Sequence, residues 1–321
     1  IETSGTPGVP LARQFSEDRL VLDQLASRSE SGGGLTIVPY ISSYSVWLLG
    51  SRVAELTGRP VRVAGPPPEL SERVNSKLWF AQRVRDLLGA GALPRTHVAS
   101  DERELKAHFE RLAALGGRLV VKIPSSSGGR GIVTIEAASV ETSRESSTVE
   151  WLHEVLSDGG WSGRYPLVVG EWEEAVVASP SVQAWIPDQG SGPPVVEAVF
   201  DQVVQHGRFV GASRSTMPEQ VQARLAHDGM ELALLLQQLG YFGRCSFDAV
   251  LVGESVNDAS VHWLECNGRW GGVSTAVAAL KRLVGDRPDR PFVVVQTEDR
   301  LARPRSFEEV IGVLGLDSFH R

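Results

Sequence analysis

The segment LVVKIPSSSGGRGIVTIE, residues 119–136, places a glycine- and serine-rich loop between two apolar runs. Both runs have the length and β-branched content of strands, and Lys122 stands at the end of the first. Glycine would let the loop approach a ligand closely, and backbone N–H groups with serine hydroxyls would supply donors, which suits polyphosphate oxygens. The alternative, an ordinary hairpin loop, is equally open on this segment alone. The loop residues concerned are Ser125, Ser126, Ser127, Gly128, Gly129 and Gly131.

A second polar set lies in the segments FDAVLV and WLECNGRWGG, which we predict to be paired strands carrying Asp248, Glu265 and Asn267. Because strand side chains alternate, Glu265, Asn267 and Arg269 would share one face, and Cys266 would point to the other. Two carboxylates and a carboxamide are hard oxygen ligands that suit magnesium. Arg269 would then hold a carboxylate or a transferring phosphoryl group. Its alternative is a surface ion pair with Glu265.

The composition of the 321-residue chain favours small-molecule partners. A formal net charge of -7 argues against a protein that grips nucleic acid through its phosphates. Only two cysteines occur, Cys245 and Cys266, so we expect buried thiols and a reducing, cytoplasmic compartment instead of a disulfide framework. No run approaches the roughly 18 consecutive apolar residues that a membrane span needs, and no leader pattern is visible.

The order of predicted elements indicates an α/β (α+β) protein. Residues 35–65 read as strand, helix and strand, with the helix closed by Gly58, and such a unit implies parallel strands. Helices are predicted over 102–117 and 219–239, and an antiparallel meander over 180–215. We expect four parts: an N-terminal α/β domain (1–74), a small subdomain with the glycine-rich loop (75–170), a subdomain with the metal site (171–285), and a C-terminal extension (286–321).

Taken together, these motifs resemble those of the ATP-grasp carboxylate–amine ligases over roughly residues 75–274. The matching segments, in order, are VNSK, VVKIPSSSGGRGI, VVGEWEE, SPSVQAWIP, GYFGRCSFDAV and WLECNGRWGG. The version ECNGRWGG is most similar to the actinomycete peptide ligases of the pheganomycin-ligase type. The resemblance implies an ATP-grasp fold, preceded by the pre-ATP-grasp βαβ domain that the family carries upstream.

The resemblance also implies roles for the nucleotide-binding residues. Lys77 and Lys122 correspond to the two family lysines that hold the phosphates of ATP, and the loop at 125–131 corresponds to the lid over them. A hinge strand in the family contacts the adenine and offers a carboxylate to the ribose. That segment is GEWEE here, with Glu171 as first choice and Glu174 as second.

The remaining implied roles concern Mg²⁺ and the substrates. The metal ligands of the family map onto Asp248, Glu265 and Asn267, with Asp248 standing where many relatives have glutamate. Arg269 maps onto the basic residue that follows. Arg214 lies where relatives hold the substrate or the acyl phosphate, and its alternative is a solvated arginine at a strand end.

We therefore expect an ATP-dependent ligase that forms an amide or peptide bond between a carboxylate and an amine, with an amino acid or a peptide as substrate. The reaction would pass through an acyl phosphate and release ADP and phosphate. In the pheganomycin-type family this chemistry would serve natural product biosynthesis, in a possible homodimer. Two alternatives stay open: a small-molecule kinase of the same fold, and a nucleotide-binding module with a decayed site.

Overall fold

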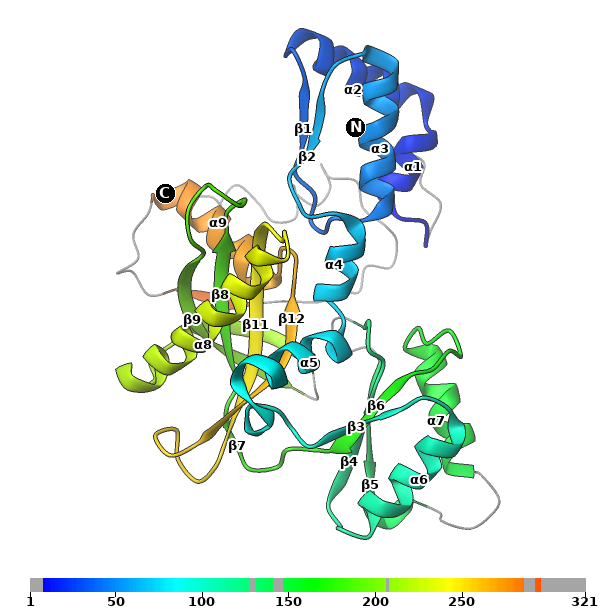
Figure 1. Cartoon of the computed structure of the whole chain (residues 1–321), viewed down its shortest axis with the longest axis vertical. Coiled ribbons are helices and arrows are strands. Elements are labelled where there is room, and N and C mark those ends of the chain that lie inside the picture. Colours follow the sequence, from blue (N-terminus) through cyan, green and yellow to red (C-terminus); the bar gives the residue numbers. More distant parts are fainter. Residues whose placement is uncertain (1–7, 127–130, 141–146, 206–207, 286–291, 296–321) are drawn as a thin grey trace.

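The computed structural model describes residues 8–126, 131–140, 147–205, 208–285 and 292–295, and their strands form sheets of two, four and seven strands (Figure 1). In Figure 1 the two-stranded sheet lies at the top, the seven-stranded sheet to the left and the four-stranded sheet at the lower right. Among the described residues, no helix combines the length and the apolar character that crossing a bilayer requires.

The N-terminal unit contains the predicted parallel strand pair. Strands β1 (Leu35–Ile37) and β2 (Val61–Val63) pair in parallel and are joined by helix α3 (Tyr44–Thr57). Helix α3 ends at Gly58, whose φ of 63° lies in the left-handed region where glycine has no steric penalty. The predicted βαβ unit is therefore confirmed.

Two helices precede this unit, whereas the segment FSEDRLVLDQLASR, residues 15–28, predicts one. Helices α1 (Leu11–Glu17) and α2 (Arg19–Ser31) meet at Asp18, whose carboxylate accepts hydrogen bonds from the N–H groups of Leu20 and Val21. Asp18 has extended backbone angles, so it ends α1 and caps α2 at the same time.

The four-stranded sheet is antiparallel and carries the glycine-rich loop. Its order is β3 (Thr96–Ala99), β6 (Leu167–Glu171), β4 (Arg118–Lys122) and β5 (Ile132–Glu136). The predicted pairing of the strands on either side of the loop is confirmed, whereas β3 was not predicted. One face of the sheet packs against helices α6 (Glu102–Ala113) and α7 (Ser147–Asp158).

The seven-stranded sheet contains the predicted meander and the predicted hairpin of the acidic strands. Its order is β12 (Ser260–Asn267), β11 (Gly243–Val252), β8 (Pro180–Ile186), β9 (Val195–Gln205), β10 (Arg208–Arg214) and β13 (Val293–Val295), with β7 (Val176–Ala178) also paired to β11. The helices around it are α4 (Pro68–Val74), α5 (Lys77–Leu88), α8 (Glu219–Gln238) and α9 (Gly272–Val284), and short 3-10 turns occur at Ala90–Ala92 and Ala137–Ser139.

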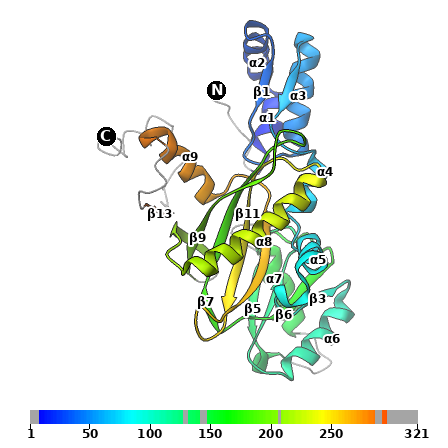
Figure 2. The ribbon, with the colours of Figure 1, turned by 60° about the vertical axis from the view of Figure 1, so that its left-hand side comes forward.

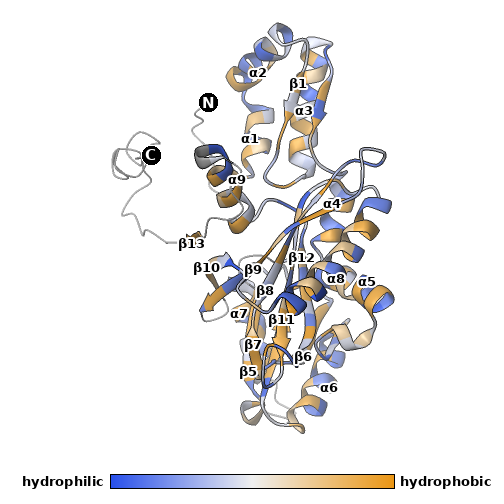
Figure 3. Cartoon of the chain, turned by 90° about the vertical axis from the view of Figure 1, so that its left-hand side faces the viewer, coloured by the Kyte–Doolittle hydropathy of each residue, from blue (hydrophilic) through white to orange (hydrophobic). Residues whose placement is uncertain are grey.

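The two faces of this sheet have different coverings, as strand alternation requires. Val199 packs into the core formed with α5 and α8, whereas its neighbour Phe200 packs with Val273 of α9 on the other face. Figure 2 shows α8 crossing the sheet and α9 to the left of it, and in Figure 3 the central strands are largely apolar. The face opposite α5 and α8, on which Asp248 and Glu265 are partly exposed and Ser181 is buried, is called the open face below.

The C-terminal region agrees only in part with the sequence. Helix α9 was not predicted, although its apolar residues follow the glycines of the last motif directly. The segment RPFVVVQTED, residues 290–299, predicts a strand, which exists as β13 and pairs antiparallel with β10. The segment SFEEVIGVLGL, residues 306–316, predicts a helix and lies outside the described residues.

Candidate active site

A row of paired residues crosses the open face of the seven-stranded sheet. Asp248 is paired with Glu265 on one side and Ser181 on the other, Ser181 is paired with Phe200, and Phe200 with Arg214. Residues paired directly across antiparallel strands point to the same face. Two predicted metal ligands and the predicted substrate arginine therefore lie in one line on one surface.

Asp248 and Glu265 are brought together with Asn267, as the strand alternation predicted. Asn267 Nδ2 donates to Asp248 Oδ2 at 2.8 Å and weakly to Glu265 Oε1 at 3.5 Å. The other oxygen of Asp248 accepts from Ser181 Oγ at 2.6 Å and from Gln202 Nε2 at 3.2 Å. Ser181 and Gln202 were not found by sequence reasoning, since they come from neighbouring strands.

The charge at this site is concentrated on the two carboxylates. Burial, together with the negative charge of Glu265, raises the pKa of Asp248 to about 6. Burial also acts to raise the pKa of Glu265, but the Lys77 ammonium outweighs it, and the pKa of Glu265 falls below its usual value. A cation at these oxygens would relieve the repulsion between the two carboxylates.

Lys77, the first residue of α5, is buried beside this pair. Its Nζ lies 2.8 Å from Glu265 Oε2 and donates to the carbonyl oxygen of Ser126 at 2.8 Å. The Lys77 backbone N–H donates to the carbonyl of Pro124 at 3.0 Å. Lys77 thus joins the glycine-rich loop of one sheet to the acidic strand of the other.

Lys122 ends β4 at the base of the loop, as predicted. Burial lowers the pKa of its ammonium, and the charge of Lys77 lowers it further, against the opposing effect of Glu265 and Glu173. Within the described ranges, the side-chain ammonium of Lys122 makes no hydrogen bond or ion pair, although its backbone pairs with β5 and β6. A half-buried ammonium without such a partner is suited to hold an anion.

The described part of the loop consists of Ser125, Ser126 and Gly131, whereas Ser127, Gly128 and Gly129 lie outside the described residues. Gly131 has a φ of 80°, and a Cβ at this position would lie 2.7 Å from Ile123 Cδ1. Only glycine fits this turn without strain or displacement. The start of β5 thereby returns close to the end of β4.

Arg269 does not form the ion pair with Glu265 that the alternative reading required. Its Nη1 donates to Asn75 Oδ1 at 2.7 Å, and the same oxygen accepts from the N–H of Gly268 at 3.1 Å. Asn75 Nδ2 in turn donates to the Gly268 carbonyl at 3.3 Å. Asn75 therefore holds the turn that follows β12.

The predicted hinge carboxylates lie in different environments. Glu171 pairs with Leu119 across the sheet, which places it on the face covered by α6 and opposite to Lys122. Glu174 is exposed and forms an ion pair with Arg118 at 3.2 Å.

Glu173, between them, is the hinge carboxylate whose charge reaches Lys122. Its Oε1 lies 2.6 Å from His262 Nδ1 on β12. The sequence contained this signal, since Glu173 belongs to the same GEWEE segment. The role of each hinge carboxylate remains a prediction.

Among the described residues, no group of three or more His, Cys, Asp and Glu side chains is placed to hold a metal ion. The oxygen set proposed from the sequence consists of two carboxylates and an amide, and its residues are adjacent in the structure. The two cysteines are buried in the core with α5 and α8, as expected.

The known proteins that match this chain were found by structure and not by sequence. No protein-family model matches the chain, and no curated protein matches it.

Solved structures do match. Biotin carboxylase from Campylobacter jejuni, complexed with a β,γ-ATP compound, superposes with a TM-score of 0.57 at 14% identity, over 82% of this chain and 55% of that chain. The biotin carboxylase domain of Hydrogenobacter thermophilus 2-oxoglutarate carboxylase, complexed with MgADP, ADP and bicarbonate, gives a TM-score of 0.54 at 15% identity, over 78% and 51%. D-alanyl-alanine synthetase A from Vibrio cholerae gives 0.50 at 12% identity, over 72% and 66%.

The chain therefore has the ATP-grasp fold that its sequence implied. It spans between about half and two thirds of the length of these structural neighbours.

Proposed function

We propose that the chain is an ATP-dependent ligase that forms an amide bond between a carboxylate and an amine and releases ADP and phosphate. The observation that carries this proposal is the meeting of Lys77 and Lys122 with the acidic strand pair. The ammonium groups of Lys77 and Lys122 lie close enough to Glu265 on the seven-stranded sheet to interact with its charge. A polyphosphate with a bound metal ion needs both kinds of group, cations for the phosphate oxygens and carboxylates for the metal. The ATP-grasp fold of the chain supports the same reading.

ATP and Mg²⁺ fit the residues present. Asp248, Glu265 and Asn267 offer oxygen donors, and the amide nitrogen of Asn267 is turned to the carboxylates, which leaves its carbonyl oxygen for a ligand. A magnesium ion held there would neutralise phosphate charge during transfer. Two structural neighbours were solved with nucleotide, one as MgADP and one as a β,γ-ATP compound, which is consistent with this assignment.

The reaction has two steps. An oxygen of the substrate carboxylate attacks the γ-phosphorus of ATP, the bond to the β–γ bridging oxygen breaks, and ADP leaves. The amine nitrogen then attacks the acyl carbon, phosphate leaves, and the amine loses a proton. Phosphoryl transfer depends mainly on positioning and charge neutralisation, so no nucleophilic side chain is needed.

The candidate site residues have separate roles in this scheme. Lys122 and Lys77 hold phosphate oxygens, and the loop from Ser125 to Gly131 covers them and excludes water, which would hydrolyse the acyl phosphate. Arg269, oriented by Asn75, and Arg214 stabilise the charge of the acyl phosphate. Glu173 replaces Glu171 as our first choice for the ribose, because its charge reaches Lys122 and Glu171 lies on the other face.

The finer assignments belong to the same proposal. The segment ECNGRWGG supports a peptide ligase similar to the pheganomycin type, and we extend the proposal to a homodimer active in natural product biosynthesis in the cytoplasm. The domain limits 1–74, 75–170, 171–285 and 286–321 are part of it, because each sheet lies mainly in one of the first three spans, although α5, within 75–170, packs into the core of the seven-stranded sheet.

The proposal is tested by incubating the protein with ATP, magnesium and a pool of amino acids and short peptides, followed by mass spectrometry and nucleotide analysis. We expect a condensed product and ADP in equal amounts. A stable phosphorylated product without condensation would indicate the kinase instead. Failure to bind ATP would indicate a decayed site, and formation of AMP would contradict the acyl phosphate.

A further inference from the structure

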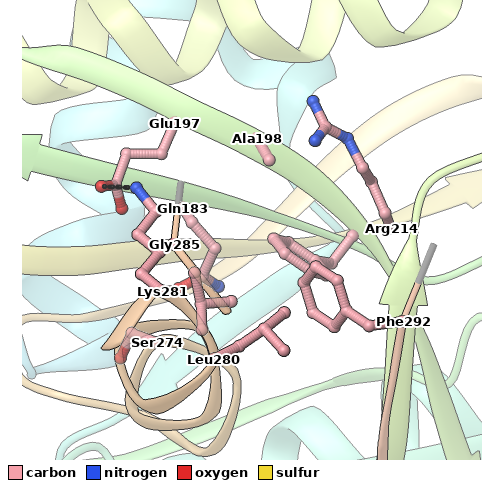
Figure 4. Close-up of a pocket in the computed structure, with 11 residues that line it drawn as sticks. Gln183, Glu197, Ala198, Arg214, Ser274, Leu280, Lys281, Gly285 and Phe292 are labelled. Atoms are coloured by element: carbon pink, nitrogen blue, oxygen red, sulfur yellow. Dashed lines mark ion pairs between the residues drawn. The ribbon is translucent and has the colours of Figure 1, made fainter. Parts of the chain in front are cut away.

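A cavity lies on the open face of the seven-stranded sheet, between β8, β9 and β10 on one side and α9 on the other (Figure 4). Its volume is about 80 Å³, which by the measure of about 10–15 Å³ for one water leaves room for several non-hydrogen atoms. Most of its wall is apolar. The apolar lining residues are Ala198, Phe200, Val277, Leu280 and Phe292.

The register of the sheet places this cavity next to the proposed metal ligands. Phe200 and Asp248 belong to the same row, separated only by Ser181 on β8. Neighbouring strands are about 4.8 Å apart, so Phe200 lies roughly 10 Å from Asp248 along the row. Gln183, which lines the cavity, donates to Ser181 Oγ at 2.9 Å, and Ser181 donates to Asp248. The cavity therefore adjoins the place where the phosphoryl group would be transferred.

Charged residues stand at the two ends of the apolar wall. In Figure 4 Arg214 and Phe292 lie at one end, and the ion pair of Glu197 with Lys281 lies at the other. Glu197 also pairs with Arg244, so its carboxylate faces two cations. The cationic side chains of the lining, Arg214 and Lys281, thus lie at its ends, and Lys281 is paired with Glu197. The wall between them is apolar and suits an uncharged group.

We propose that the cavity binds the apolar side chain of the acid that is activated, so that the enzyme selects carboxylic or amino acids with branched aliphatic or aromatic side chains. The inference rests on the proposed ligase function. The carboxylate of the acid extends along the row from Phe200 toward Asp248, and Arg214 lies at the far end of the cavity, on the other side of Phe200. Leu280 and Phe292 close over the side chain from the α9 side.

Hydroxylamine trapping tests this assignment because it reads which acid is activated. Hydroxylamine replaces the amine, attacks the acyl phosphate and gives the hydroxamate of the acid with release of phosphate. We expect leucine, phenylalanine and their N-acetyl derivatives to yield hydroxamates together with ADP. Serine, glutamate and their N-acetyl derivatives should yield at least about tenfold less hydroxamate.

Leu280→Gln places a polar group in the wall, and we expect it to lower the kcat/KM for apolar acids about tenfold with unchanged ATP binding. The control Leu115→Gln makes the same change at a position that is 66% exposed and outside the cavity, and should have no effect. Ala198→Leu fills the cavity, so it should shift the preference from phenylalanine toward smaller acids.

The possible outcomes distinguish failure of the side-chain pocket from failure of the proposed ligase function. Equal trapping of polar and apolar acids, or a Leu280→Gln variant with wild-type selectivity, would overturn the inference and leave the ligase standing. Absence of any ADP or hydroxamate with every acid, despite folded protein, would contradict the ligase itself.

Discussion

Lys77 Nζ lies 2.8 Å from Glu265 Oε2, and this ion pair joins the first turn of α5 to the end of β12. Lys77 also donates to the carbonyl of Ser126. One ammonium group therefore connects the glycine-rich loop with the proposed metal ligands. A nucleotide held by the loop would therefore interact with the charges of both Lys77 and Glu265.

Replacing Glu265 with Gln removes the charge of this pair and keeps its shape. We expect ADP formation to fall by about 10²–10³-fold, because a charged metal ligand is lost. The free energy of unfolding should fall by about 1–3 kcal/mol, since the buried ammonium loses its counter-charge. Steady-state kinetics and urea unfolding measure the two effects. Glu254→Gln, on the exposed turn between β11 and β12, is the control, and an equal loss there would discredit the assignment.

Asn75 positions Arg269 without touching substrate in our scheme. Asn75→Ala would free the guanidinium and leave the N–H of the buried Gly268 without its acceptor. We expect kcat to fall about tenfold or more with little change in KM for ATP, and stability to fall by about 1–3 kcal/mol.

Asn75→Asp retains the accepting oxygens and should restore most of kcat. If the aspartate variant were as impaired as the alanine variant while equally stable, Arg269 would not depend on this contact.

Gly131→Ala tests whether the loop base needs close packing. An added Cβ would lie 2.7 Å from Ile123 Cδ1 and 2.9 Å from Ser126 Cβ, at a φ of 80°. Gly116→Ala is a matched control, since its φ is 77° and nothing lies within 4 Å of an added Cβ. Both variants carry backbone strain, but only Gly131→Ala should weaken ATP binding, by about tenfold, in equilibrium titrations. Equal nucleotide affinity in the two would contradict a role for this turn.

His97 predicts a pH dependence of stability. Burial lowers its pKa below 6.5, and the positive charges of Arg111 and His108 lower it further. The folded state therefore favours neutral His97, and its stability should fall as the pH drops below about 6.5, where the unfolded chain takes up the proton. Urea unfolding at about pH 8 and about pH 5.5 measures this loss, which His97→Gln should reduce. An unchanged loss in the variant would assign it to other groups.

The sequence was most informative where the chemistry depends on local spacing. Strand alternation is enough to place Glu265 and Asn267 on one face, and a lysine before a glycine-rich loop is a local pattern. The bond between Asn75 and Arg269 joins residues 194 positions apart, and no periodicity signals it. The face of Glu171 depended on the pairing of β6 with β4, which the sequence did not specify.

Helix α9 shows a different reason for a missed element. Its residues, GVSTAVAALKRLV, begin with glycine and β-branched residues of low helix propensity. The contact of Val273 with Phe200 and Ala212 stabilises it as part of the fold. The cavity wall that α9 contributes was therefore also beyond sequence reasoning.

The central claim is that the substrate carboxylate attacks ATP directly, and an isotope measurement tests it most directly. An acid that the enzyme accepts is labelled with heavy oxygen in its carboxylate, and the released phosphate is analysed by mass spectrometry. The account predicts one labelled oxygen in each inorganic phosphate formed with the amide. Label in AMP, or label retained only in a stable phosphorylated acid, would contradict it.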